Sequence, residues 1–295
     1  MDAKDAASAM NEALAAGAQS TRVDMHCHST ASQISRLGVQ RAVGLPECAT
    51  PPQEVYELAK RRGMDFVTIT DHDTIAGVLE IADRPDVFVS EELTAHFRGE
   101  PQAVHVLCYG ISPDDHEWLQ AHRGDVEICA AYMYERDIVC ALAHPYYTVG
   151  APLTARHRRR LAHLFEIWEV RNGARPRELN RPAATYMATL AGAGIGGSDD
   201  HAGVDIGRTW TAAPLAHTPV EFLAHVRGRA VSAGGAQGSG WGGCRPASIP
   251  PSSSTGLDRV GSRNLSGVQY WSISKVARST YVIASTSGRP GSFTL

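Results

Sequence analysis

Histidine and acidic residues recur at short spacings in this chain, next to apolar runs that have the composition of buried strands. The first such segment, VDMHCHSTAS at residues 23–32, places His26 and His28 two positions apart, with Asp24 two positions before His26. Because side chains alternate between the two faces of a strand, these three would share one face. That face could hold a metal ion, or it could be the solvent side of an ordinary edge strand. The rest of the chain decides between the two.

Five further predicted strand ends carry residues of the same types. They are Asp71 and His72 in TITDHDT, Glu92 in VSEELT, His105 in AVHVLCYG, His144 in LAHPY, and Asp199 and His201 in GGSDDHAG. In a barrel of parallel strands the carboxyl ends meet at one mouth, where active sites are built. Six strand ends with metal-binding residue types would be a repeated coincidence if each were only structural, so we interpret them as one site.

The residue types narrow the chemistry of that site. Imidazole and carboxylate without thiolate suit Zn, Mn or Fe. A catalytic zinc takes about three protein ligands plus water, so this set predicts two or three divalent ions. Two ions about 3.5–4 Å apart can share a hydroxide and stabilise both the attacking and the leaving oxygen in a displacement at phosphorus. The candidate metal ligands are His26, His28, His72, Glu92, His105, His144, Asp199 and His201.

Alternating strand-like and helix-like segments must position these residues. We expect strands at residues 21–27, 64–70, 86–94, 103–110, 137–145, 166–173 and 195–203, and helices at 50–63, from 112 onward, and at 154–165, 177–194 and 218–228. Apolar strands that alternate with helices predict an α/β fold with a parallel sheet. About seven strands favour a closed or nearly closed barrel, although an open doubly wound sheet stays possible. No phosphate-binding GxxxxGK[ST] or dinucleotide GxGxxG follows a strand.

Composition sets the boundaries of the domain and the compartment. Residues 1–20 indicate an N-terminal tail, residues 21–231 the folded domain, and residues 232–295 a low-complexity tail made of a Gly/Ser/Pro-rich linker and an atypical C-terminal segment. A net charge of −3 argues against bulk electrostatic binding of nucleic acid, so we do not expect nucleic acid as a partner. Six cysteines without CxxC spacing indicate reduced thiols rather than a disulfide framework, and there is no apolar signal core, so we expect a cytoplasmic protein. No apolar run reaches membrane-spanning length, so we do not expect the protein to bind a membrane.

Four segments in order, VDMHCHS, TITDHDT, LAHP and GGSDDH, resemble the four motifs of the polymerase and histidinol phosphatase (PHP) family. The resemblance covers about residues 22–230. It implies a distorted (β/α)7 TIM-like barrel with a two- or three-metal centre that hydrolyses phosphate esters.

The resemblance also implies a role for each matching residue. The first ion would be held by His26, His28, Glu92 and Asp199, the second by Glu92 as a bridge with His105 and His144, and the third by His72 and His201. Glu92 is preferred to Glu91 because EELT lines up with the family's strand end. Asp24 and Asp71 would orient ligand histidines. The family usually has Asp or His where this chain has Gln33 and Ile34, so the third site is expected to be weak, empty or completed from the loop that follows.

These assignments predict a hydrolase of small phosphate esters, of the nucleotide, sugar phosphate or histidinol phosphate type. His201 or His72 would protonate the leaving group, and Arg171 and Asn172 at the end of strand 166–173 would bind the substrate phosphate. An amidohydrolase or deaminase is the alternative enzyme class, since such enzymes also begin with His-x-His on a metal-binding barrel. A metal-binding module without catalytic activity is the third possibility.

Overall fold

The computed structural model describes residues 19–32, 47–190 and 192–238. Most of the predicted N-terminal tail, the positions of Gln33 and Ile34, and most of the predicted C-terminal segment lie outside the described residues.

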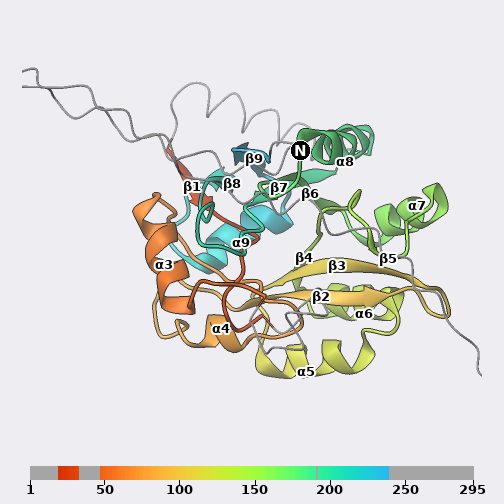
Figure 1. The fold of residues 1–295 in the computed structure, drawn as a ribbon, viewed down its shortest axis with the longest axis horizontal. Helices are drawn as coiled ribbons and strands as arrows, with labels where there is room; N and C mark the ends of the chain where they lie inside the picture. Colours follow the sequence, from red (N-terminus) through yellow and green to blue (C-terminus); the bar gives the residue numbers. More distant parts are fainter. Residues whose placement is uncertain (1–18, 33–46, 191, 239–295) are drawn as a thin grey trace, which may run out of the picture. The chain divides into compact units, whose positions relative to one another are not determined.

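The described strands form two sheets (Figure 1). The larger sheet has the order β2-β3-β4-β6-β7, made of Ser90–His96, Gln102–Tyr109, Val139–Leu142, Ile167–Asn172 and Ala193–Gly197, with β5 (Val149–Gly150) paired to β3. The smaller sheet is antiparallel, with the order β1-β8-β9, made of Ser20–Val23, Thr209–Pro214 and Ser232–Gly235. The α/β class is therefore confirmed.

The closed parallel barrel is not seen in the described part of the chain, and this expectation needs correction. Strands β2, β3 and β4 pair antiparallel, whereas only β4–β6 and β6–β7 are parallel. Residues 97–101 between β2 and β3 are too few for the crossover that a parallel pair requires. The expected strand 64–70 pairs only through an isolated bridge between Val67 and Val87. The result is a mixed sheet beside a small antiparallel one.

Seven helices lie in the described part of the chain: α3 (Pro52–Arg61), α4 (Ala76–Leu79), α5 (Pro113–His122), α6 (Val126–Glu135), α7 (Ala155–Leu164), α8 (Arg177–Thr189) and α9 (Pro219–Arg227). Ser112 and Thr154 begin α5 and α7 with capping boxes, and the Thr218 hydroxyl accepts the Glu221 N–H at the start of α9. Helices α5 and α6 pack against β2 (Figure 1). None of the described helices is long and apolar enough to cross a membrane.

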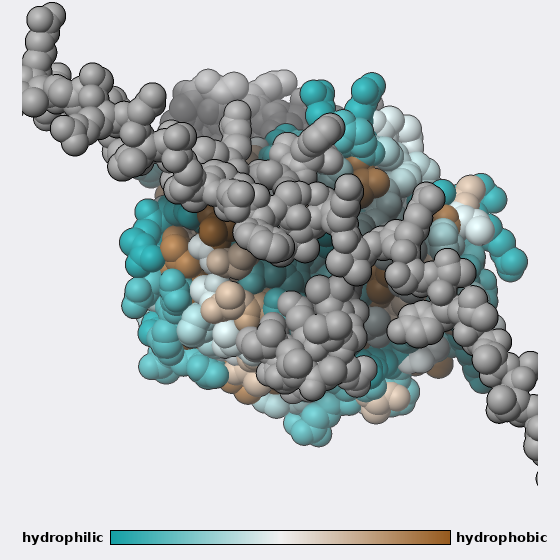
Figure 2. All heavy atoms as spheres, in the orientation of Figure 1, coloured by the Kyte–Doolittle hydropathy of each residue, from teal (hydrophilic) through white to brown (hydrophobic). Residues whose placement is uncertain are grey.

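Strand β3 shows how the larger sheet is buried on both faces. Val106 and Cys108 belong to one hydrophobic cluster, while Leu107 and Tyr109 belong to the other. Strict alternation explains this split, and it places His105 on the same face as Leu107 and Tyr109. Hydrophilic side chains remain outside, over α3 and α7 at the two sides of the view in Figure 2. The side chain of His105 is therefore buried beside apolar residues, away from bulk water.

Candidate metal centre

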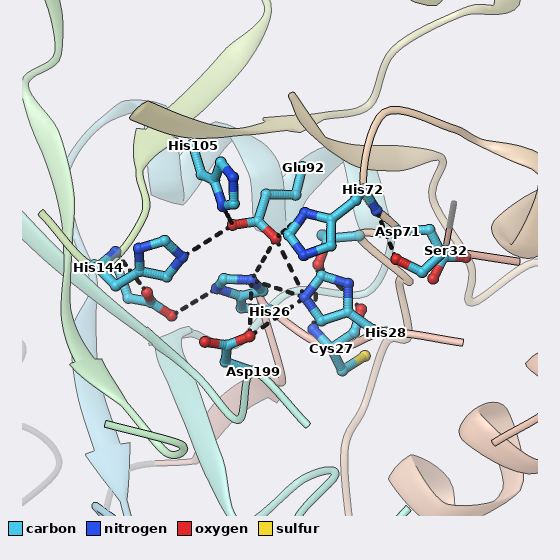
Figure 3. A network of polar contacts seen from close by, with 12 residues as sticks. His26, Cys27, His28, Ser32, Asp71, His72, Glu92, His105, His144 and Asp199 are labelled. Carbon is cyan, nitrogen blue, oxygen red and sulfur yellow. Dashed lines mark hydrogen bonds and ion pairs between the residues drawn. The ribbon is translucent and has the colours of Figure 1, made fainter. Parts of the chain in front are cut away.

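The carboxylate of Glu92 lies at the centre of a group of histidine rings (Figure 3). Its Oε2 is 3.1 Å from His26 Nε2, 3.2 Å from His28 Nε2 and 3.0 Å from His72 Nδ1. Its Oε1 is 2.6 Å from His105 Nδ1 and 3.0 Å from His144 Nε2. Both oxygens of one buried carboxylate thus face imidazole nitrogens, an arrangement that suits a carboxylate bridging two ions.

Asp199 supplies a second carboxylate on the opposite side of the first histidine pair. Its Oδ1 is 3.4 Å from His28 Nε2, 3.6 Å from His26 Nε2 and 3.7 Å from His201 Nδ1. Its Oδ2 accepts hydrogen bonds from Asn172 Nδ2 at 3.0 Å and lies 3.0 Å from Arg175 Nη2. All eight candidate ligands therefore lie in one continuous cluster, and groups of three ligand atoms within 4.8 Å of one another recur across it.

Short strand pairings bring these distant segments together. Cys27, between the first two histidines, bridges Asp200 in parallel, and His72 bridges Glu92 in the same way. Alternation along β2 directs Glu92 to the centre and Glu91 to α5, where Glu91 Oε2 accepts hydrogen bonds from His116 Nδ1 and Gln120 Nε2, both at 2.8 Å.

Two of the candidate ligands have a left-handed backbone conformation. The φ angle is +24° at His144 and +51° at Asp199, values that cost about 1–3 kcal/mol for residues other than glycine. Hydrogen bonds hold both conformations, since the His144 N–H donates to Glu169 Oε2 at 2.9 Å and the Asp199 N–H donates to the His26 carbonyl at 2.6 Å. Strain of this kind concentrates at functional sites.

Glu169 is a central residue that the sequence analysis missed. It is almost fully buried on β6, and its Oε1 is 3.0 Å from His26 Nδ1. Its Oε2 also accepts a hydrogen bond from Asn172 Nδ2 at 2.9 Å. A carboxylate bound to one ring nitrogen fixes the tautomer that presents the other nitrogen to a metal. A signal was present in the sequence, because Glu169 interrupts the apolar run of IWEV.

Asp24 and Asp71 accept hydrogen bonds from backbone N–H groups and from a serine hydroxyl rather than from histidine rings. Asp24 accepts the backbone N–H groups of His26, Ser198 and Gly207 at 3.2, 2.8 and 2.7 Å. Asp71 accepts both the N–H and the hydroxyl of Ser29 at 2.6 Å. Burial raises the pKa of Asp24 to about 6, against the opposing effect of these hydrogen bonds. Both carboxylates therefore stabilise the backbone segments that carry the candidate histidine ligands.

A cavity of about 230 Å³ opens onto the cluster, and its walls explain which predicted substrate-binding residues reach it. The lining residues are Glu47, His72, His144, Tyr147, Arg175, Asp199 and His201. Neither predicted substrate-binding residue is among them: Asn172 is buried and donates a hydrogen bond to Asp199, and Arg171 donates to the Gly235 carbonyl at 2.8 Å. Arg175 and Glu47, neither of which the sequence analysis named, stand in the cavity wall instead.

The electrostatics of the cluster fit a cation. Burial alone would raise the pKa of Glu92, but the facing histidines outweigh it and hold that pKa well below its usual range. Burial lowers the pKa of His105 to about 3 and of His201 to about 4, so both rings are neutral at pH 7. Burial would lower the pKa of His28, but the nearby carboxylates of Asp199 and Glu92 outweigh burial and raise it to about 9, so an ion there would displace a proton.

Buried side-chain atoms of the cluster that lack hydrogen-bond partners also indicate a cation site. Glu92 Oε2 and His72 Nδ1 are both buried and 3.0 Å apart, yet neither has a hydrogen-bond partner. Buried polar atoms are rarely left without partners, and acceptor atoms that converge in this way fit a divalent cation between them.

Comparisons with known proteins agree with this fold. No family model matches the chain. The uncharacterized protein MJ1587 of Methanocaldococcus jannaschii is 32% identical over 59 residues, which are 20% of this chain and 33% of that protein. The chain therefore spans about a third of the curated relative that it matches.

Solved structures are similar over most of the chain. A two-domain protein from Bacteroides vulgatus that contains a predicted PHP-like metal-dependent phosphoesterase has a TM-score of 0.54 and 15% identity, over 75% of this chain and 66% of its own. An amidohydrolase from Chromobacterium violaceum, with bound sulfate and no metal, has a TM-score of 0.50 and 16% identity, over 71% of this chain and 97% of its own. The chain is therefore similar in fold both to a protein that contains a predicted PHP-like phosphoesterase, as the four motifs predicted, and to an amidohydrolase.

Proposed function

We propose that this protein is a metal-dependent hydrolase of phosphate esters that acts on a small phosphorylated molecule, of the nucleotide, sugar phosphate or histidinol phosphate type. The observation that carries the proposal is the buried carboxylate of Glu92, with imidazole nitrogens facing both of its oxygens, in a PHP-like fold.

The donor set suits two to three ions of Mn, Zn or Fe. We assign His26, His28, Glu92 and Asp199 to the first ion, Glu92, His105 and His144 to the second, and His72 and His201 to the third. When bound, the ions supply an activated water and stabilise negative charge on the phosphoryl oxygens. The donor chemistry and the convergence of unpaired buried atoms support this assignment.

Arg175 is our candidate for binding the substrate phosphate. Its guanidinium lies 3.0 Å from Asp199 Oδ2 and over the Tyr147 ring at 3.9 Å, with a side chain that is 20% exposed in the cavity wall. Asp199 contacts Nη2 and the Tyr147 ring lies against one face of the guanidinium, so other N–H groups remain for phosphate oxygens, which arginine can bind in a bidentate manner. Asn172 holds Asp199 and Glu169 in place beside it.

His201 is better suited to ligation than to proton donation. Its Nδ1 donates to the Asp199 carbonyl at 3.0 Å, so in the neutral ring Nε2 carries the lone pair. Its side chain lines the cavity and is 30% exposed, so this lone pair can reach an ion bound in the cavity. We therefore propose His201 as a metal ligand.

The size of the cavity supports a small substrate, since about 230 Å³ is below the usual range of roughly 300–1,000 Å³ for drug-sized ligands. The expectation against nucleic acid rests only on the net charge of −3 and gains no further support. The similarity of the fold to an amidohydrolase keeps C–N hydrolysis as the competing activity.

A release assay separates these activities. The full chain is loaded with Mn, Zn, Fe or Mg and incubated with nucleotides, sugar phosphates and histidinol phosphate, and with deaminase substrates, while phosphate and ammonia are measured in parallel. We expect phosphate release that falls on the order of 100-fold or more in Glu92→Gln, because even indirect contacts to metal ligands contribute 10–100-fold. Glu54→Gln, an exposed position on α3, is the matched control.

Ammonia release without phosphate release from any ester would contradict the proposal and favour an amidohydrolase. Phosphate release that persists unchanged in Glu92→Gln would show that the activity does not come from this centre.

A further inference from the structure

A second and larger cavity, of about 500 Å³, lies between α8, β6 and the strand β9. Its apolar walls include Val170, Met187 and Val231, and its polar walls include Arg171, Arg177 and Arg181. No aspartate or glutamate is among its described lining residues. We call this cavity the arginine groove.

An irregularity in β6 separates the arginine groove from the metal centre. The pairing of β6 with β7 shifts register between Glu169 and Arg171, which indicates a bulge. Because a bulge adds a residue and re-aims the side chains after it, Val170 and Arg171 both line the groove. Glu169 and Asn172 contact the metal cluster on the other side of the strand. Strand β6 therefore contacts the metal cluster through Glu169 and Asn172 and lines the arginine groove through Val170 and Arg171.

The charges of the arginine groove are unbalanced. Arg171 makes one hydrogen bond, to the Gly235 carbonyl, and within the described part of the chain none of the three arginines has a carboxylate partner. Arg177 and Arg181 are exposed and four positions apart on α8, so they lie on the same face of the helix. Burial, and then the like charge of Arg177, lowers the pKa of Arg171. Converging cations without an acidic partner are an electrostatic cost that an anionic ligand would remove.

The remaining walls define the rest of the ligand. Met187 and Val231 are buried apolar residues that offer a surface for a non-polar or planar group. The side-chain oxygen of Gln237 is buried and has no hydrogen-bond partner, so it can accept a hydrogen bond from a hydroxyl or amino group. A volume of about 500 Å³ is within the range of small-molecule sites.

We propose that the arginine groove is a second binding site, distinct from the metal centre, for a small phosphorylated molecule with an apolar body and a hydrogen-bond donor. The phosphate lies between Arg171, Arg177 and Arg181, and the body of the ligand lies against Met187 and Val231. The site does not depend on the proposed phosphoesterase activity.

Binding must be measured where the metal centre cannot contribute. The full chain carrying Glu92→Gln is stripped with a chelator and titrated calorimetrically with AMP and with inorganic phosphate as probes. We expect AMP to bind more tightly than inorganic phosphate, because the apolar walls add to its affinity. The double variant Arg177→Ala/Arg181→Ala should weaken AMP binding at least about 10-fold, since it removes two charged hydrogen-bond donors to the phosphate.

Two further variants make the result specific. Arg156→Ala/Arg159→Ala removes two exposed arginines of α7 and should leave AMP binding unchanged, which controls for overall charge. Ala184→Trp fills the arginine groove without a change of charge and should abolish binding. The proposal is overturned if neither probe binds, if both arginine pairs weaken binding equally, or if Ala184→Trp binds AMP as the parent chain does.

Discussion

At the residue scale, the carboxylate of Glu169 connects two of the proposed metal ligands. One of its oxygens contacts His26 Nδ1, and the other accepts the backbone N–H of His144, whose φ of +24° needs support. Glu169 therefore holds the orientation of one ligand ring and the backbone of another. We expect it to act as a positioning residue rather than as a ligand, because the metal-facing nitrogen of His26 is Nε2.

Glu169→Gln tests this role. The amide keeps the size of the side chain but removes the negative charge that stabilises the His26 tautomer, so metal affinity should fall about 10–100-fold with the fold intact. Isothermal titration with Zn or Mn measures the affinity. Glu166→Gln is the control, since Glu166 is an exposed residue that only makes a surface ion pair with Arg229. Equal metal affinity in Glu169→Gln and the unmutated chain would rule out the positioning role.

Glu47 could supply a carboxylate ligand to the third ion, for which His72 and His201 are the other proposed ligands. Its Oε1 is 4.0 Å from His201 Nε2, and both side chains line the smaller cavity together with His72. The backbone N–H of Ala49 donates to the His201 carbonyl at 2.9 Å, which ties this segment to the His201 loop. A carboxylate there would offset part of the charge of a dication, which His72 and His201 as neutral imidazoles would leave intact.

Glu47→Gln should therefore lower the number of bound ions from three to two while the Glu92-centred pair stays loaded. Metal content after gel filtration, measured by mass spectrometry, gives the stoichiometry directly, with Glu54→Gln as the control. An unmutated chain that never holds more than two ions, or a Glu47→Gln variant that still holds three, contradicts this assignment.

At the element scale, the sequence predicted where strands and helices lie better than how the strands pair. The apolar runs around Leu107, Leu142 and Trp168 became β3, β4 and β6 because burial on both faces leaves a clear pattern. Pairing direction depends on connection length, and the short 97–101 link forces β2 and β3 antiparallel. Neither β8 nor the Gly-rich β9 was among the expected strands, and β9 has no apolar pattern, so their pairing was not predicted.

The same limits apply to the candidate site. The sequence could indicate which eight side chains come together because their residue types are distinctive, although Glu92 and His105 lie within strands β2 and β3 rather than at strand ends. Arg171 was expected beside them, but the bulge in β6 directs it into the arginine groove, and no residue pattern marks the bulge. Arg175 reaches Asp199 from the turn after β6, by a geometry that exists only once the loop is folded.

Strand β7 lies close to the segment that carries His26, and this contact can be tested by substitution at Gly197. A Cβ atom at Gly197 would lie 2.4 Å from both the backbone nitrogen and the Cβ of His26. Gly197→Ala must therefore push β7 away from His26, at about 1–3 kcal/mol or more of lost stability, and weaken metal binding. Gly124→Ala, where nothing lies within 4 Å, is the matched control. Thermal melting and metal titration should show loss only at Gly197, and an unchanged Gly197→Ala variant would mean that the two segments do not pack so closely.

At the scale of the whole molecule, the metal centre joins segments from both ends of the described chain. The candidate ligands come from the segment after β1, the loop before α4, strands β2 and β3, and the segments after β4 and β7. An ion bound to the folded state alone stabilises it by RT ln(1 + [M]/Kd), which is about 2.7 kcal/mol when the free ion is at 100 times its Kd. In the absence of ions, carboxylates and imidazoles remain packed together in a water-poor interior, which is costly.

Removal of metal should therefore lower the melting temperature by roughly 5–10 °C, because 1 kcal/mol corresponds to about 2–4 °C in a domain of this size. Scanning calorimetry of the full chain after chelation, and again after Zn or Mn is restored, measures the shift and its reversal. Glu92→Gln should show a much smaller shift, since the bridging ligand is missing, whereas Glu54→Gln should respond as the unmutated chain does. If the melting temperature is the same with and without ions that metal analysis shows to be bound, the ions are held outside this centre, and the assignment of its ligands fails.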